Sequence, residues 1–302
     1  MRLAIALAAL LASTSLVRAD VKVIASIKPV HSLVASVMQG VGTPGLIVGG
    51  SNSPHTYALK PSDADALQKA DVIFWIGHEL EAFLEKPMEA LGGNAKSVSL
   101  LDASGITKLA PREGNGFDPD EHEDGGEAHA GEEADAHIWL DPENAKVILT
   151  LIAETLSKAD AANAETYKIN AKNTAASLDA MSAEIVASIE PAKGKGFIVF
   201  HDAYHYFENR FGVKASGAIS INPENPPGAQ GIAALQKRIA DGNVRCVFAE
   251  PQFDNTLVKL VIEGSNVKSA ILDPEGANLE PGPALYEALL RDMAKSLVQC
   301  LQ

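Results

Sequence analysis

Four side chains that can bind a metal ion stand where one predicted element of the chain gives way to the next. They are His55, His137, His201 and Asp273. Imidazole nitrogens and carboxylate oxygens are common ligands of divalent metals in proteins. If the fold brings these element ends together, the four side chains can converge on one ion. The spacing alone does not show that they meet, because any one of these residues taken by itself is more commonly structural.

The pentapeptide His201-Asp202-Ala203-Tyr204-His205 imitates the zinc-protease motif HExxH, with aspartate in place of the catalytic glutamate. That motif needs both histidines on one face of a helix, whereas His201 directly follows four strand-like residues. We therefore expect His201 at the entrance of a helix, and we expect no protease. His205 is then expected on a helix face or at the rim of a cleft. Whether His205, or His78 after another predicted strand, contacts metal stays open.

An acidic stretch from Glu113 to His137 differs in composition from the rest of the chain. It holds many acidic residues and several glycines, and it shows no hydrophobic periodicity. This composition predicts a loop without regular structure. His122 and His129 lie inside it, and imidazole together with carboxylate suits divalent metals. The stretch is either a solvated loop or a weak secondary metal-binding segment.

Apolar runs alternate with helical patterns on both sides of a long helical region, as expected for an α/β fold with parallel sheets. Residues 142–189 contain no glycine and are rich in Ala, Lys, Glu and Leu, which predicts helix with a joint near Asp160. We expect two lobes joined by this rigid helical region, with a ligand site between them. The predicted strands include Val21–Ser26, Leu46–Val48, Val72–Ile76, Phe197–Phe200, Cys246–Ala249 and Ala270–Leu272.

The start of the chain predicts export. Residues 1–19 have a basic beginning, an apolar centre and small residues before Asp20, which is typical of a cleaved signal peptide despite the charge of Arg18. The segment has no cysteine for a lipid anchor of the usual type, so the mature protein is expected in the periplasm and not inserted in the membrane. The formal net charge of −14 argues against nucleic acid as a partner.

The chain has two cysteines, Cys246 and Cys300. In an oxidising compartment a disulfide is the favoured interpretation. Two zinc-binding thiolates are the weaker alternative, because the cysteines are not paired in a CxxC motif.

Several motifs together resemble one family. They are Ser53-Pro54-His55-Thr56-Tyr57, His137-Ile138-Trp139-Leu140-Asp141-Pro142, Phe200-His201-Asp202-Ala203-Tyr204, Phe248-Ala249-Glu250-Pro251-Gln252-Phe253 and Leu272-Asp273-Pro274. The chain resembles the cluster A-I (cluster 9) substrate-binding proteins, and among them the ZnuA-type high-affinity zinc-uptake receptors. The resemblance runs nearly end to end. It implies two α/β lobes joined by one long helix, with the metal site in the cleft between the lobes.

The resemblance also implies roles for particular residues. His55, His137 and His201 match the zinc ligands of the family, and Asp273 matches a fourth ligand of manganese-binding relatives. In zinc receptors, water or another carboxylate can take that fourth position. Cys246 and Cys300 match a disulfide of the Gram-negative zinc members. The acidic loop stands where zinc members carry a histidine-rich loop, but with His122 and His129 alone inside it, this one is poor in histidine.

The expected organisation is a signal peptide (1–19), a first lobe (20–142) that includes the acidic loop 113–137, a helical linker (143–190) and a second lobe (191–302). The expected function is a periplasmic receptor, not an enzyme, that delivers Zn²⁺ to an ABC importer. It would dock as a monomer on the membrane permease, which works with an ATPase. Three imidazoles favour zinc over manganese. The alternatives are a manganese or other divalent-metal receptor of the same fold, a surface adhesin and a zinc hydrolase.

Overall fold

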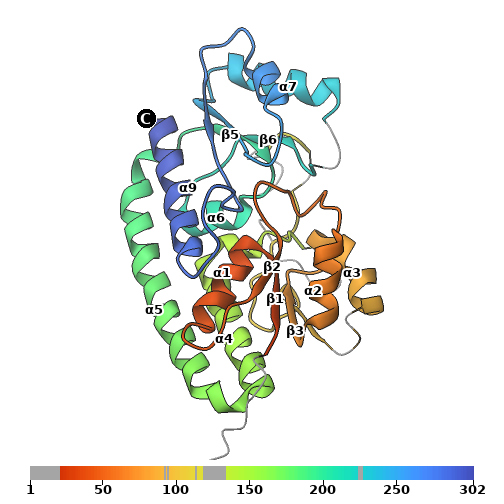
Figure 1. The fold of residues 1–302 in the computed structure, drawn as a ribbon. Helices are drawn as coiled ribbons and strands as arrows, with labels where there is room; N and C mark the ends of the chain where they lie inside the picture. Colours follow the sequence, from red (N-terminus) through yellow and green to blue (C-terminus); the bar gives the residue numbers. More distant parts are fainter. Residues whose placement is uncertain (1–20, 92, 94, 113, 118–133, 224–226) are drawn as a thin grey trace, which may run out of the picture.

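Two parallel sheets form the framework of the chain. The computed structural model describes residues 21–91, 93, 95–112, 114–117, 134–223 and 227–302. In these residues each sheet has four strands, in the orders β2-β1-β3-β4 and β6-β5-β7-β8, and all paired strands are parallel. The predicted α/β fold with two lobes is confirmed (Figure 1). The strands are β1 (Val23–Ile27), β2 (Gly45–Val48), β3 (Val72–Trp75), β4 (Lys96–Ser99), β5 (Phe197–His201), β6 (Gly217–Ser220), β7 (Cys246–Ala249) and β8 (Lys268–Ile271).

Helices surround the sheets and connect the lobes. The first lobe carries α1 (Lys28–Val37), α2 (Pro61–Lys69) and α3 (His78–Leu91). The later helices are α4 (Pro142–Ala159), α5 (Ala164–Ile189), α6 (His205–Phe211), α7 (Ala229–Ala240), α8 (Thr256–Ile262) and α9 (Leu285–Leu301). Among the described residues, no helix combines the length and the apolar character needed to cross a bilayer.

The predicted helical linker is two helices with a break at Asp160. Asp160 has φ −136° and ψ 78°, which ends α4, and its side chain accepts hydrogen bonds from Asn163 (2.6 Å) and from the hydroxyl of Tyr167 (3.1 Å). α5 then runs for 26 residues, or about 39 Å at 1.5 Å per residue. It packs on α1 of the first lobe and on α6 and α9 of the second (Figure 1). The joint near Asp160 and the spine between the lobes are confirmed.

The strand order brings the carboxyl ends of β5 and β7 together at the centre of the second sheet. The chain runs from β5 outward to β6 and from β7 outward to β8, so the two connections diverge from the centre of the sheet. In such sheets a crevice opens beyond the carboxyl ends of the two central strands. β5 ends at His201, and Glu250 directly follows β7. Polar side chains at these two positions are therefore neighbours although they lie far apart in the sequence.

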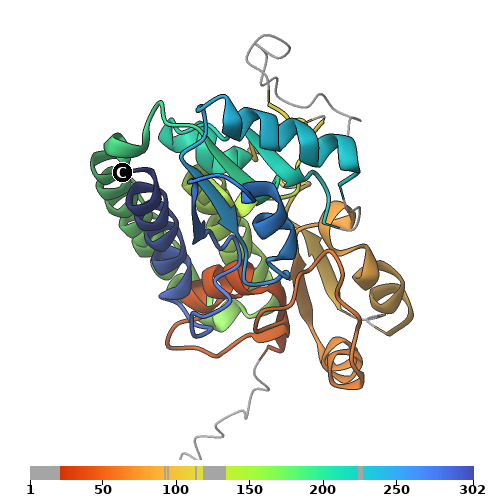
Figure 2. The same ribbon diagram turned by 90° about the horizontal axis from the view of Figure 1, so that it is seen from above.

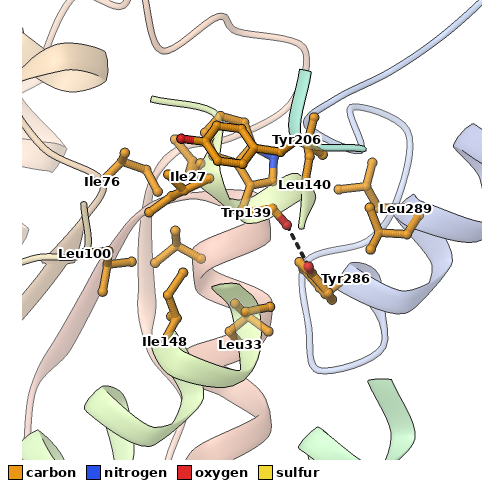
Figure 3. Close-up of a cluster of buried hydrophobic side chains, with 14 of the residues drawn as sticks. Ile27, Leu33, Ile76, Leu100, Trp139, Leu140, Ile148, Tyr206, Tyr286 and Leu289 are labelled. Atoms are coloured by element: carbon orange, nitrogen blue, oxygen red, sulfur yellow. Dashed lines mark hydrogen bonds between the residues drawn. The ribbon is translucent and has the colours of Figure 1, made fainter. Parts of the chain in front are cut away.

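Both faces of the second sheet are covered at its central strands β5 and β7, which are buried at every position. Phe197 and Val199 of β5 join a large hydrophobic cluster that also includes residues of the first lobe, α4, α5 and α9. Ile198 and Phe200 point to the other face and join a smaller cluster with α7 and α8. The large cluster continues through the junction between the lobes, where Trp139 is fully buried (Figure 3).

The last helix ties the two lobes to each other. α9 lies beside α5 (Figure 2) and also packs on α1 and β8. At its start, the hydroxyl of Tyr286 donates a hydrogen bond of 2.6 Å to the backbone oxygen of Trp139 (Figure 3). Near its end, Cys300 forms a disulfide with Cys246 of β7, with the Cα atoms 5.9 Å apart. The predicted disulfide is confirmed, and the thiolate alternative is wrong. The predicted residue boundaries of the lobes stay a prediction.

Candidate metal centre

His55 is held in the loop that follows β2. This strand is parallel to β1, and the loop leaves its carboxyl end towards the second lobe. The backbone N–H of His55 donates to the hydroxyl of Ser53, 3.3 Å away, which fixes the turn. The imidazole is partly buried. Burial, followed by the proximity of His137 and His201, lowers the pKa of His55 well below its ordinary value of 6.5. The ring is therefore neutral at physiological pH, as a metal ligand must be.

His137 lies immediately before the short 3-10 helix Ile138–Leu140, and its orientation is fixed by Asp135. The Oδ1 atom of Asp135 is 2.7 Å from Nδ1 of His137 and also accepts the backbone N–H of His137 at 3.0 Å. Burial acts to raise the pKa of Asp135, but the charge and hydrogen bonds of His137 hold it below its ordinary value. The carboxylate form of Asp135 is thereby favoured, and it keeps the proton of the imidazole on Nδ1.

His201 is the last residue of β5, and Glu250 holds it in the same way. The Nδ1 atom of His201 lies 2.7 and 2.8 Å from the two carboxylate oxygens of Glu250. The hydroxyl of Tyr204 donates to Glu250 as well, at 3.0 Å, which fixes the carboxylate from a second side. Glu250 therefore orients His201 without belonging to the group of three imidazoles.

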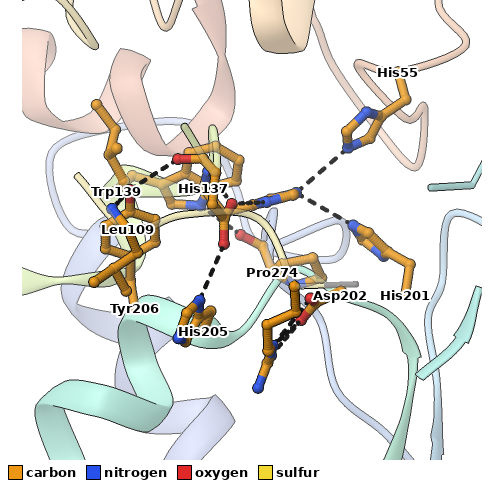
Figure 4. A network of polar contacts seen from close by, with 12 residues as sticks. His55, Leu109, His137, Trp139, His201, Asp202, His205, Tyr206 and Pro274 are labelled. Carbon is orange, nitrogen blue, oxygen red and sulfur yellow. Dashed lines mark hydrogen bonds and ion pairs between the residues drawn. The ribbon is translucent and has the colours of Figure 1, made fainter. Parts of the chain in front are cut away.

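The three imidazoles converge, and two of their nitrogen–nitrogen separations fit a tetrahedral metal site. The Nε2 atom of His137 lies 3.4 Å from Nε2 of His55 and 3.3 Å from Nε2 of His201 (Figure 4). Metal–nitrogen distances of about 2.0–2.1 Å in a tetrahedron require nitrogen–nitrogen separations of about 3.3–3.4 Å. In the tautomer that binds metal, Nδ1 donates to the carboxylate and Nε2 carries a lone pair, so the facing Nε2 atoms of His137 and His201 in that form cannot hydrogen bond to each other. A cation between them satisfies both.

Among the described residues, the group of histidine, cysteine and acidic side chains close enough to share an ion consists of His55, His137 and His201, with donor atoms within 4.8 Å of one another. The cavity beside them has a volume of about 10 Å³ for the centre of a water-sized sphere. That volume is about that of one water-sized species and is too small for an ester or peptide substrate. Its other lining residues are Ser53, Pro54, Glu250, Gln252, Phe253, Pro274 and Glu275.

The structure does not bring Asp273 into this group. Its Oδ1 atom accepts hydrogen bonds from the backbone N–H groups of Glu275 and Gly276, both at 3.0 Å, and from Nε2 of Gln252 at 2.9 Å. Its Oδ2 atom accepts the N–H of Ala277 at 2.6 Å. Asp273 follows β8 as expected, but its carboxylate folds the loop after the strand. Its predicted role as a ligand stays a prediction.

His205 and His78 lie apart from the three converging nitrogens. His205 is the first residue of α6, so it and His201 do not share a helical face, as expected from the sequence. Its Nδ1 atom is 4.0 Å from Asp135 (Figure 4). His78 begins α3, is exposed and pairs with Glu85 at 3.2 Å.

The chain that leads into the acidic stretch is attached to the second lobe. Arg112 forms ion pairs with Asp202 and with Glu208 (2.9 Å). The amide nitrogen of Asn115 donates to the backbone oxygens of Ala218 (3.1 Å) and Ile219 (2.8 Å) of the edge strand β6. The predicted weak metal ligands His122 and His129 lie outside the described residues, and their role stays a prediction.

Comparison with known proteins agrees with this geometry. A family model, ZnuA, described as zinc-uptake complex component A, periplasmic, matches residues 23–300. The chain belongs to the ZnuA family. The high-affinity zinc uptake system protein ZnuA of Brucella abortus (strain 2308) is 46% identical over 92% of this chain and 91% of that protein. The ZnuA protein of Paracoccus denitrificans (strain Pd 1222) is 37% identical over 98% and 97%.

Solved structures agree as well. A crystal structure of ZnuA matches with a TM-score of 0.78 at 26% identity and covers 94% of this chain and 100% of that chain. The resemblance seen in the motifs of the sequence is confirmed. The ZnuA family is one of uptake components, so the chain is a binding protein of a transport system and not an enzyme.

Sequence reasoning missed three residues around the site. Asp135, Gln252 and Glu275 received no role of their own, although all three are now seen beside or around the imidazoles. For Asp135 a signal existed, since an acidic residue two positions before a ligand histidine can reach its Nδ1 atom. For Gln252 and Glu275 no local pattern distinguishes a cavity-lining side chain from an exposed one.

Proposed function

We propose that this protein is the periplasmic zinc receptor of an ABC importer and that His55, His137 and His201 bind one Zn²⁺ through their Nε2 atoms. The observation that carries the proposal is the pair of nitrogen–nitrogen separations, 3.4 and 3.3 Å, between three rings from both lobes. These separations match the edge of a tetrahedral zinc site. Membership of the ZnuA family supports zinc as the cargo.

The donor set favours zinc over the runner-up, a manganese receptor of the same fold. Three imidazole nitrogens are ligands of intermediate softness, which suit Zn²⁺, whereas Mn²⁺ prefers sites richer in oxygen. Asp135 and Glu250 each lie one hydrogen bond, 2.7 Å, beyond a ligand ring, a position from which a carboxylate orients the ring and raises its basicity towards the ion. The hydrolase alternative is disfavoured, because a cavity of about 10 Å³ leaves no room for an organic substrate. The adhesin alternative stays untested.

The expected route of the ion follows from the same assignment. Residues 1–19, which lie outside the described residues, direct export as a signal peptide, and the mature monomer carries zinc through the periplasm. It then docks directly on the membrane permease of the importer, which an ATPase drives. The acidic composition makes nucleic acid an unsuitable partner.

Zinc titration of single alanine variants tests the proposal. His55→Ala, His137→Ala and His201→Ala should each weaken zinc binding by orders of magnitude in a competition assay with a chelator, while the far-ultraviolet circular dichroism stays that of the wild type. His78→Ala is the matched control, because this exposed histidine pairs with Glu85 away from the cavity. Excess Mn²⁺ in the same titration should not displace zinc. Wild-type zinc affinity in all three site variants would overturn the proposed function.

A further inference from the structure

Three imidazoles leave one corner of a tetrahedral ion for a further ligand. Besides Glu250, which holds His201, the second lobe has an acidic residue in the cavity lining, Glu275, and another, Asp273, two positions before it. Neither belongs to the group of donor atoms within 4.8 Å of one another. The oxygens of Asp273 already accept four hydrogen bonds. Three of these bonds fall on Oδ1 and one on Oδ2, so the loop after β8 and the amide of Gln252 already hold the carboxylate of Asp273 in place.

Gln252 differs from Asp273, because its side-chain oxygen receives no hydrogen bond. It lines the cavity beside the three histidines. Its Nε2 atom donates to Oδ1 of Asp273 at 2.9 Å, which fixes the identity and direction of the two amide atoms. Its Oε1 atom is buried and has no hydrogen-bond partner among the described residues. A buried carbonyl oxygen without a donor costs free energy, so a group that donates to it is expected in the loaded site.

A metal-bound water is the donor that fits this position. Water bound to Zn²⁺ is a stronger hydrogen-bond donor than bulk water, because the ion polarises its O–H bonds. The cavity volume of about 10 Å³ is close to the space that one water-sized ligand needs. Glu275 is buried and lines the same cavity, and it gives the water a second acceptor.

Given a water in the fourth position, as the resemblance to zinc receptors allows, we propose that Gln252 is the residue that positions it, and that Asp273 acts on the ion through Gln252 and not as a ligand. The chain of contacts runs from the loop after β8 through the Asp273 carboxylate to the Gln252 amide, and from its Oε1 atom to the water. The inference rests on the proposed zinc site and assigns its remaining corner.

Cobalt-loaded protein tests the first half, because Co²⁺ replaces zinc in tetrahedral sites and reports its ligands in the visible spectrum. Azide added to the wild type should displace the water and shift the visible bands. A wild-type spectrum that azide leaves unchanged, together with an azide shift that appears in Asp273→Ala, would overturn the inference in favour of a carboxylate ligand. This outcome still requires that the wild type binds metal, so it differs from failure of the proposed function.

Gln252→Leu tests the second half. The variant should still bind one Co²⁺, but its zinc Kd should rise about 10- to 100-fold, as found when a supporting hydrogen bond is removed from a metal site. Azide, which donates no hydrogen bond, should bind this variant several-fold more tightly than the wild type, because the displaced water is no longer held. A loss of structure alone would not produce that gain.

The matched control is Gln236→Leu, on α7, where the amide donates only to the backbone oxygen of Leu260 at the surface. It should keep both wild-type constants. If Gln252→Leu also keeps both, the positioning role is wrong. If Gln252→Leu does not fold, the Asp273→Ala variant decides. Its zinc Kd should rise by a similar factor, and azide should bind it more tightly than it binds the wild type. If azide binds Asp273→Ala but does not bind the wild type at all, the positioning role is refuted.

Discussion

At the scale of single residues, the proposed site depends on two carboxylates that lie behind its imidazoles. Asp135 and Glu250 each accept a hydrogen bond from Nδ1 of a ligand histidine, at 2.7 Å in both cases. This contact selects the tautomer with a free Nε2 and fixes the plane of the ring. The third ring, His55, lies in a loop and is partly buried, so it comes from the less constrained side of the cleft. Two of the three histidines, His137 from the first lobe and His201 from the second, are therefore oriented in advance by a carboxylate.

The three histidines could be predicted from the sequence because each stands at the end of an apolar run or beside a family motif. Which histidine Glu250 would contact could not be predicted, since Glu250 meets His201 only through the pairing of β5 with β7. The side-chain direction of Asp273 was also beyond the sequence. Its position after β8 places Asp273 at the carboxyl edge of the sheet, where the site lies. Whether its carboxylate binds an ion or accepts backbone N–H groups is decided by the fold of the loop after the strand.

Glu81 carries a further residue-scale prediction, away from the ligands. Its side chain is fully buried at the start of α3 and accepts the backbone N–H groups of Gly77 (3.0 Å) and Ile76 (3.3 Å). Burial raises the pKa of Glu81 from 4.5 to about 7, although these hydrogen bonds oppose the rise. A folded-state pKa above the unfolded value means that the folded protein binds more protons between these two pH values. Stability from this group is therefore full below about pH 4.5 and is lost as the pH rises towards about 7.

Urea unfolding of metal-free protein at several pH values checks this prediction. Relative to Glu81→Gln, whose side chain does not titrate, the wild type should lose on the order of 1 kcal/mol of unfolding free energy per pH unit within the window from about 4.5 to 7. Above that window the difference should level off. Parallel stability curves for the two proteins across the whole range would show that the folded pKa is not raised.

At the scale of elements, the central strands were predictable and two edge strands were not. β1, β3, β5 and β7 are continuous apolar runs, as expected for strands covered on both faces. β4, with the sequence Lys-Ser-Val-Ser, lies at a sheet edge and lacks such a run. β6 is also an edge strand and begins with glycine. Edge strands are paired on one side only, so composition constrains them less.

Gly196, directly before β5, carries the element-scale prediction. A Cβ atom at this position would lie 1.8 Å from the backbone oxygen of Asn243, which precedes β7. The Gly196 oxygen also accepts the N–H of Arg245 at 2.9 Å, so the two backbones are held together here. Gly196→Ala should force the starts of β5 and β7 apart and lower the unfolding free energy by about 2 kcal/mol or more.

Chemical denaturation compares this variant with Gly93→Ala, where an added Cβ meets no atom within 4 Å. The control should unfold within about 0.5 kcal/mol of the wild type, as substitutions in open space do. If the two variants lose equal amounts of unfolding free energy, the close approach of Gly196 to Asn243 is not the reason why glycine is needed at position 196.

At the scale of the whole molecule, the two lobes are joined at several places besides the spine. The amino group of Lys28, at the start of α1, donates to the backbone oxygens of Gly276 (2.5 Å) and Ala277 (2.9 Å) in the loop after β8. Tyr286 reaches the backbone of Trp139, beside His137. These contacts place His55 of the first lobe at a set distance from the other two rings. The cleft is therefore largely preformed for the ion, which lowers the ordering cost of binding.

The disulfide belongs to the same scale, because it joins α9, which contacts both lobes, to the central strand β7. Cys246 is the first residue of β7, at the opposite end of the strand from Glu250, so the bond lies away from the cavity. The bond closes a loop of 54 residues, and the loop-entropy model gives about 4 kcal/mol for that constraint on the unfolded chain. Replacing both cysteines with alanine should lower the unfolding free energy by roughly that amount, while the protein still binds one zinc with wild-type affinity. Urea unfolding and zinc titration of Cys246→Ala/Cys300→Ala, beside thiol counting in the unfolded wild type, measure both effects; a folded double variant that has lost the zinc would instead place the bond in the binding machinery.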